Sequence, residues 1–163
     1  MNTHEAIQGS LKLAREITDM LLADLSDDDL LIRPVPEANH IAWQLGHLIG
    51  AEHHMMSELP ESDMPALPDG FTEKYSKETS KSDDASLFES KQTYLDLYGQ
   101  VRRGTLATLE RLSDDRMGEP APEAYREMFK TVGGLVSLQA SHELMHLGQY
   151  TVVRRKLGKA VAF

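Results

Sequence analysis

Hydrophobic residues recur at intervals of three and four along four stretches of the chain, the spacing that places them on one face of an α-helix. The first stretch spans residues 3–25, and its apolar positions are Ile7, Leu11, Ala14, Ile17, Leu21 and Leu22. The other three span about residues 40–59, 86–112 and 131–157. No stretch has the alternation typical of a β-strand. The pattern therefore predicts an all-α protein, and four long helices predict a four-helix bundle.

Polar residues mark the predicted helix ends. Thr3 and Asn39 are the predicted N-caps of the first and second helices, because short polar side chains accept hydrogen bonds from free N–H groups of the first turn. The segment Ser86-Leu87-Phe88-Glu89 has capping-box spacing and predicts the start of the third helix. The fourth helix is predicted to start near Thr131 and to continue to Leu157, with Gly158 as its C-cap signal and three basic residues in its last turn.

Two substantial connections separate the predicted helices. Residues 60–81 contain three prolines and a glycine, and residues 113–125 contain two prolines. The longer one suits a crossover connection or a lid over a site. With these connections the bundle is predicted to be up-up-down-down, formed by one domain over residues 1–163. Gly46 and Gly50, one turn apart, predict close approach of a neighbouring helix to the second helix.

Composition narrows the partners and the cell compartment. The chain has 17 basic and 26 acidic residues and a formal charge of −9, which argues against nucleic acid and an anionic membrane surface as partners. It has no cysteine, so thiolate ligands and a cysteine nucleophile are excluded. Neither a signal peptide nor an apolar run of about 18 residues is visible in the sequence. A cytoplasmic protein is the expectation.

Histidines on two helices suggest a metal site. His142 and His146 are four residues apart, so both lie on one face of the fourth helix. That core-facing stripe is predicted to contain Leu135, Leu138, His142, Met145 and Gln149, with Gln139, His146 and Val153 beside it. Buried polar groups need partners, and a metal ion supplies one for both imidazoles. His47, on the apolar face of the second helix, is the predicted third ligand, which leaves positions open to water or substrate as in catalytic sites.

The same histidines also spell His-Glu-x-x-His, the zincin protease pattern, in which Glu143 would be the general base. A zincin takes its third ligand from downstream of this pattern. None of the 17 residues after His146 is His, Asp or Glu. Neighbouring helix positions differ by about 100°, so Glu143 is expected to face another helix or solvent instead. A metallohydrolase of this kind is the least favoured alternative.

The combination of motifs resembles the DinB / YfiT-like family over nearly the whole chain. The residues that carry the resemblance are Asn39-x-x-x-Trp43-x-x-Gly46-His47-Leu48 and, near the C-terminus, His142-x-x-x-His146-x-Gly148-Gln149. The resemblance implies a four-helix bundle, often dimeric, with a divalent metal held by His47, His142 and His146. Characterised relatives include thiol-dependent S-transferases and a mycothiol-dependent maleylpyruvate isomerase. Trp43 is expected to be a packing anchor rather than a surface on which substrate stacks.

The leading hypothesis is therefore a divalent-metal-dependent enzyme, with Zn, Ni, Fe or Mn at an open three-histidine site. It would act on a small molecule as a transferase or isomerase that uses an external low-molecular-weight thiol, and the resemblance implies a homodimer. The residues expected to line the site are Gln44, His54 and Gln149. The alternative is a metal-binding or interaction bundle without catalysis. No catalytic residue is assigned beyond the predicted ligands.

Overall fold

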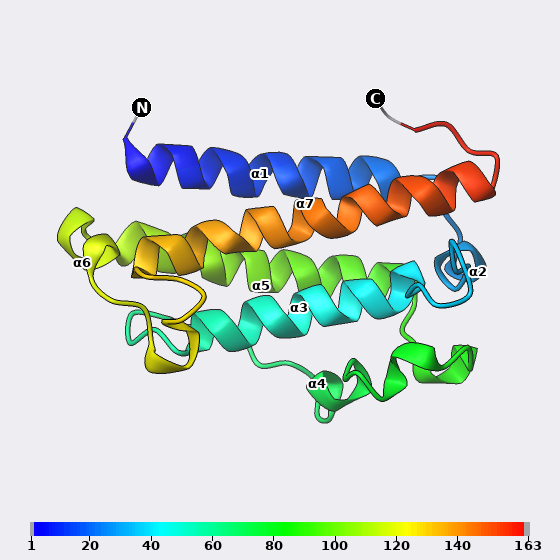
Figure 1. Ribbon diagram of the computed structural model, residues 1–163, viewed down its shortest axis with the longest axis horizontal. Coiled ribbons are helices and arrows are strands. Elements are labelled where there is room, and N and C mark those ends of the chain that lie inside the picture. The colour runs from blue at the N-terminus through cyan, green and yellow to red at the C-terminus, as the bar shows by residue number, and fades with distance from the viewer. Residues whose placement is uncertain (1, 162–163) are drawn as a thin grey trace.

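Four long helices lie side by side and make up most of the computed structural model, which describes residues 2–161 (Figure 1). They are α1 (Thr3–Leu22), α3 (Ile41–Ser57), α5 (Lys91–Arg111) and α7 (Val132–Lys156). The connections contain the short helices α2 (Asp27–Leu30), α4 (Phe71–Lys74) and α6 (Asp114–Gly118), and 3-10 turns at Thr79–Lys81, Ala85–Leu87 and Glu123–Tyr125. Within residues 2–161 the only strand-like pairing is an isolated bridge between Pro120 and Thr131. The predicted all-α four-helix bundle is confirmed.

The helices run in the order up-down-down-up, which corrects the predicted up-up-down-down order (Figure 1). Helices α1 and α5 are antiparallel. His4 at the start of α1 contacts the carbonyl of Leu112 at the end of α5, and Lys91 at the start of α5 contacts the end of α1. The main pairings are α1 with α7, which are parallel, and α3 with α5, which are also parallel. Only one long connection, residues 58–90, therefore crosses between parallel helices. The other, residues 112–131, joins the antiparallel helices α5 and α7.

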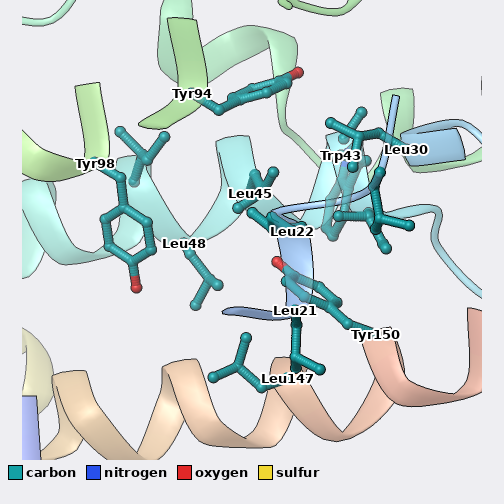
Figure 2. Packing of buried hydrophobic residues seen from close by; sticks show 14 of the residues in the cluster. Leu21, Leu22, Leu30, Trp43, Leu45, Leu48, Tyr94, Tyr98, Leu147 and Tyr150 are labelled. Atoms are coloured by element: carbon teal, nitrogen blue, oxygen red, sulfur yellow. The ribbon is translucent and has the colours of Figure 1, made fainter. Parts of the chain in front are cut away.

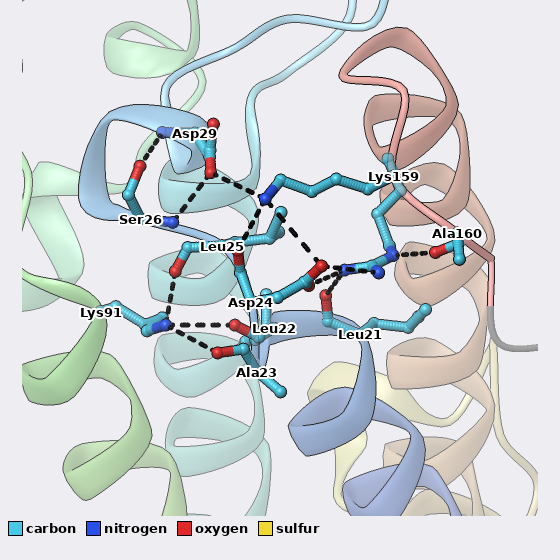
Figure 3. Close-up of polar contacts among 11 residues, drawn as sticks. Leu21, Leu22, Ala23, Asp24, Leu25, Ser26, Asp29, Lys91, Lys159 and Ala160 are labelled. Atoms are coloured by element: carbon cyan, nitrogen blue, oxygen red, sulfur yellow. Dashed lines mark hydrogen bonds and ion pairs between the residues drawn. The ribbon is translucent and has the colours of Figure 1, made fainter.

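Basic side chains from other elements complete the C-terminal end of α1, which has none in its own last turn (Figure 3). Lys91, the first residue of α5, donates to the carbonyls of Leu22 and Ala23 at 3.2 and 3.4 Å and also to that of Leu25. Arg154 of α7 donates to the carbonyl of Leu21 at 2.7 Å, and Lys159 donates to that of Asp24 at 2.7 Å. These cations lie where a helix end has unpaired carbonyls and partial negative charge. They fix the ends of three segments together.

The first two helices begin with caps next to the predicted ones. Asn2, not Thr3, caps α1, because its side chain accepts from the N–H of Glu5 while the Glu5 carboxylate accepts from the N–H of Asn2. His40, not Asn39, caps α3, since its Nδ1 accepts from the N–H of Trp43 at 3.1 Å. An imidazole lies outside the usual set of capping side chains, so the sequence pattern favoured the asparagine.

The predicted start of the third helix is wrong by one turn. Residues Ala85–Leu87 form a 3-10 turn, and α5 begins at Lys91 with Ser90 as its cap. The serine hydroxyl accepts from the N–H of Thr93 at 3.2 Å, so a second cap four residues later takes the place of the predicted one. Thr131 caps α7 as expected, and Gly158 has the positive φ of 68° that follows a helix end.

Two apolar clusters fill the bundle, one towards each end. Figure 2 shows the cluster near the C-terminal end of α1, where Leu45 and Leu48 of α3 lie between the tyrosines of α5 and residues of α7. The second cluster surrounds Leu11 and Leu135 at the other end. In the region between the two clusters, each long helix contributes at least one buried polar side chain. These are Thr18, Glu52, Arg102, Thr105 and Glu143. We call these five residues the polar layer.

The buried face of α7 is rotated from the predicted one. Met145, predicted to face the core, is 59% exposed, whereas Glu143, Leu147 and Tyr150 are buried. The predicted stripe did not include Glu143, whose carboxylate contacts Thr18 of α1 and Arg102 of α5, so the observed buried face is turned towards those helices. Every helix in the described residues is too short or too polar to cross a membrane.

Candidate metal centre

Three histidines from two helices meet beside the bundle core. His47 comes from α3, and His142 and His146 come from consecutive turns of α7. One ring nitrogen from each lies within 4.8 Å of the others. The Nε2 atoms of His142 and His146 are 3.3 Å apart. Two nitrogens on one zinc ion at ~2.05 Å and a tetrahedral angle are separated by about 3.3 Å, so the spacing of this pair fits a shared metal ion.

Gln44 fixes the ring orientation of His146. The Nδ1 of His146 lies 2.7 Å from the Oε1 of Gln44, and the Gln44 amide nitrogen donates to the carbonyl of Asn39 at 2.6 Å. Because the amide oxygen can only accept, Nδ1 of His146 carries the proton and Nε2 keeps its lone pair. This arrangement is typical of metal-binding histidines, whose second nitrogen is held by a neighbouring acceptor.

Trp43 holds the ring of His47 in place by stacking on it. The two rings stack with centroids 5.0 Å apart and planes within 6°. The indole N–H donates to the carbonyl of Ser76 at 3.2 Å and to the Thr79 hydroxyl at 3.3 Å, which anchors it to the 58–90 connection. Trp43 is buried and therefore serves as the packing anchor that the sequence predicted.

The surroundings keep all three imidazoles neutral. Burial lowers the pKa of His47. Burial, and then the nearby His47, lower the pKa of His142 to about 4. Burial, His142 and His47 together lower the pKa of His146 to about 3. A neutral imidazole is the form that binds metal, so the donor set fits a divalent ion at neutral pH.

A cavity of about 180 Å³ opens beside His47. Its lining residues come from α3 and from the 58–90 connection, and they are Gly46, His47, Gly50, Ala51, His54, Thr72 and Tyr75. A Cβ atom on Gly46 would lie 2.2 to 2.4 Å from three carbons of the Tyr75 ring, so the glycine is required for that ring to pack. The close approach predicted at Gly46 is therefore made by the connection rather than by a neighbouring long helix.

The predicted lining residues have three different positions. His54 is exposed and lines the cavity. Gln44 is fully buried behind His146, so it supports a candidate ligand instead of facing the open side. Gln149 is half-buried, and no hydrogen bond within residues 2–161 joins it to the histidines.

Thr72 and Tyr75 were not predicted from the sequence as lining residues. They lie in the long connection that was predicted only as a crossover or a lid. The signal that could have found Tyr75 was Gly46 itself, since a helix glycine beside a predicted ligand indicates that something bulky approaches there.

Glu143 points away from the histidines into the polar layer. Its Oε2 accepts from Arg102 at 2.9 Å, and its Oε1 accepts from the Thr18 hydroxyl at 2.5 Å. Arg102 also binds both oxygens of Glu52, at 2.9 and 2.8 Å, and donates to the carbonyl of Leu11 at 2.8 Å. Glu143 is fully buried, so both its oxygens are committed to α1 and α5. The expectation that it faces a neighbouring helix agrees with this geometry.

The fold and the histidine cluster define a class, a four-helix bundle with three imidazoles gathered between two of its helices. Residues 10–150 match the profile of the DinB superfamily, and the chain belongs to that superfamily. The predicted family is confirmed. A comparison with curated proteins found no match.

Solved structures share the fold at low sequence identity. A conserved protein from Enterococcus faecalis aligns with a TM-score of 0.74 and 16% identity, covering 98% of this chain and 99% of its own. YfiT from Bacillus subtilis, described as a probable metal-dependent hydrolase with an unusual four-helix bundle topology, aligns with a TM-score of 0.62 and 18% identity. That alignment covers 96% of this chain and 89% of YfiT. At these identities the likeness establishes the fold alone.

Proposed function

We propose that this protein is a divalent-metal-dependent enzyme whose metal is held by His47, His142 and His146. The observation that carries the proposal is three neutral ring nitrogens within 4.8 Å of one another, one of them oriented by Gln44. Three protein ligands leave coordination positions for other molecules, as in catalytic sites. When bound, a divalent ion supplies Lewis acidity and lowers the pKa of a thiol or water molecule that binds it.

The residues around the histidines have two further roles, which are to hold the imidazoles in place and to form the substrate cavity. Gln44 and Trp43 hold two of the imidazoles in place, so the ligand geometry is set before substrate arrives. The cavity beside His47 has room for the organic part of a substrate and keeps it next to the metal position. Tyr75 closes one wall, and burial raises the pKa of its hydroxyl, so it stays neutral and does not act as a base at neutral pH.

We propose a low-molecular-weight thiol as the nucleophile and a small electrophile as the acceptor. The chain has no cysteine, so the thiol comes from outside. In the transfer the thiol loses its proton to solvent and its sulfur forms a bond to an electrophilic carbon, while a leaving group departs or an adjacent double bond takes the electron pair. The cavity has room for the organic part of the thiol or of the electrophile.

The test combines metal analysis with an activity panel. Elemental analysis of the purified protein should find one of Zn, Ni, Fe or Mn, and His47→Ala should lose most of it while keeping its helicity by circular dichroism. The parent should transfer thiols to electrophiles only when metal is present. His53→Ala is a matched control on the same helix, since His53 contacts the carbonyl of Pro65 instead. Equal metal content in His47→Ala and the parent would mean that the site is wrongly assigned, and metal without thiol transfer would favour a binding protein.

Glu143→Gln separates this proposal from zincin-type hydrolysis. Because Glu143 is bound to Arg102 and Thr18, we expect the variant to keep its metal and more than a tenth of the metal-dependent activity. Removal of a general base costs ~10²–10⁴-fold in rate, so the two mechanisms give clearly separate results. A loss in that range, with metal still bound, would make Glu143 catalytic and hydrolysis the leading reaction.

We also propose a homodimer formed through the outer face of α1 and α7. This face carries the exposed apolar residues Leu13, Met20, Leu144, Met145 and Val152. It also contains an apolar groove of about 170 Å³ between Leu21 and Leu147. The exposed apolar residues and the groove lie on the same face, so a two-fold symmetric contact between identical copies would cover both. Sedimentation equilibrium should give twice 18.2 kDa, and Leu144→Lys should give the monomer, with Val35→Lys as an exposed apolar control. An 18.2 kDa species alone at micromolar concentration contradicts the dimer.

A further inference from the structure

The cavity beside His47 follows the surface of α3 for two turns. His47, Gly50, Ala51 and His54 are spaced three, four and seven residues from the first, so they share one helix face. Two of these positions, Gly50 and Ala51, carry at most a methyl group. The floor of the cavity is therefore flat and apolar, and it leads from the metal position to the exposed His54.

The opposite wall is held in a fixed place. Tyr75 is buried, and its hydroxyl lies 2.8 Å from that of Tyr94, which in turn accepts from the backbone N–H of Glu89 at 3.1 Å. Its ring also packs against Phe71 at a centroid distance of 4.8 Å. Because the ring lies directly over Gly46, it cannot move inward. The space between this wall and Gly50 is thus preformed.

The volume indicates what fits. A cavity of about 150 Å³ lined by apolar side chains binds benzene in another protein. The present cavity is about 180 Å³. Gly46, Gly50 and Ala51 supply apolar surface, and the Tyr75 ring supplies an aromatic face of the kind that packs on another ring at 4.5–7 Å.

We propose that this cavity is a subsite for a six-membered ring or a branched apolar group of the same size, and that Gly50 sets that size. The substrate class is then a small molecule whose nucleophilic or electrophilic atom sits one or two bonds from such a group. This inference rests on the proposed function for its link to catalysis, but the subsite itself does not require the metal.

Substitutions at Gly50 test the size limit directly. A Cβ atom there would lie 3.4 Å from the Cγ2 of Thr72, an ordinary contact, so Gly50→Ala folds and fills part of the cavity. Gly50→Val adds two further methyl groups to the same space. Gly99→Ala is the matched control, because it also replaces a helix glycine and its new Cβ would meet only the end of the Arg103 side chain, at 3.5 Å. Circular dichroism confirms that each variant is folded.

The first measurement uses benzyl alcohol as a probe and amide chemical shifts as the readout. It is done on the zinc-loaded protein and again after metal removal. Saturable shifts of Gly46, Gly50 and Thr72 are expected in both samples, with methanol as a probe that lacks the ring. Gly50→Ala should weaken binding and Gly50→Val should abolish it, while Gly99→Ala matches the parent. Absence of saturable shifts in the parent, or parental binding by Gly50→Val, overturns the subsite.

The second measurement connects the subsite to the metal. Calorimetry on zinc-loaded protein should show benzyl mercaptan binding at least about tenfold more tightly than ethanethiol, since the ring buries additional apolar surface. In Gly50→Val the two affinities should agree within about threefold. A ratio that persists in this variant overturns the assignment of Gly50. Failure of zinc or of both thiols to bind, with benzyl alcohol binding intact, instead counts against the proposed function and leaves the subsite standing.

Discussion

Two polar clusters meet neighbouring faces of a single turn of α7, and they differ in the partners of their polar atoms. In the polar layer the Glu143 carboxylate meets Arg102 and Thr18, and Arg102 meets Glu52. One residue earlier along the helix, His142 faces His47 and His146. The first cluster is complete within the protein. In the second, three ring nitrogens converge within 4.8 Å of one another and, within residues 2–161, no charged side chain stands among them.

The difference teaches how to separate a structural polar cluster from a binding site. A guanidinium between two carboxylates forms a closed set of charge-assisted hydrogen bonds. Three neutral imidazoles present ring lone pairs that converge within 4.8 Å, a donor set that one added cation can bind. Glu143 and His142 are neighbours in sequence, and a helix separates their side chains by about 100°. The Glu in His-Glu-x-x-His therefore lies in the polar layer and points away from the imidazoles.

The largest expected effect is a loss of folding stability when the polar layer is broken. Arg102→Met leaves the buried carboxylates of Glu52 and Glu143 without their cation, and breaking a buried pair in this way costs ~3–5 kcal/mol of stability. Urea denaturation should show that loss, whereas Met in place of the exposed neighbour Arg103 should change the free energy of unfolding by less than about 0.5 kcal/mol. If Arg102→Met unfolds like the parent, the polar layer is not a stabilising cluster of the kind described.

A smaller effect, on metal affinity, is expected when the hydrogen-bond partner of His146 is removed. Gln44→Leu removes the acceptor of the His146 Nδ1 proton while keeping a buried side chain of similar size. Loss of such a supporting partner costs ~10–100-fold in metal affinity. Competition with a chromophoric chelator measures this affinity. Gln149→Leu, one turn beyond His146, is the control and should bind metal like the parent. Equal affinities for Gln44→Leu and the parent would show that Gln44 does not orient the ligand.

The smallest effect concerns pH in the metal-free protein. The pKa of His146 falls from its ordinary value of 6.5 to about 3 on folding, so the unfolded chain binds more protons than the folded one between these values. The stability is therefore full above pH 6.5 and falls as the pH is lowered through it. Between pH 7 and 5 we expect His146 to account for about 1 kcal/mol after allowance for solvent screening. Urea titrations of the parent and of His146→Gln should differ in this slope, and parallel curves would refute the expectation.

The histidine cluster and the helix ends could largely be predicted from the sequence, because they depend on local spacing along a helix. His142 and His146 are four residues apart in a helix, so their proximity needs no knowledge of the fold. His47 followed from its apolar surroundings, which place it on an inward face. Helix ends were within one turn for the same local reason, although His40 took the capping role expected of Asn39.

The partners of charged residues were not accessible in the same way. Arg102 lies between Val101 and Thr105 on a face that reads as apolar, but nothing local says that Glu52, 50 positions earlier, meets it there. Tyr75 likewise reaches Gly46 only through the path of the 58–90 connection. The order of helix directions failed because loop length alone does not decide whether a connection joins parallel or antiparallel helices. These features depend on the packing of distant segments.

The completion of α1 by cations from elsewhere has a kinetic consequence. Its last carbonyls are bound by side chains 66 to 135 positions further along the chain, so that turn is finished only after almost the whole polypeptide is in place. Contacts between such distant positions form late, because loop closure must precede them. During synthesis the end of α1 therefore waits for α7. Arg154→Met should accelerate unfolding and leave the folding rate nearly unchanged in stopped-flow experiments, whereas slower folding would place this junction in the folding nucleus.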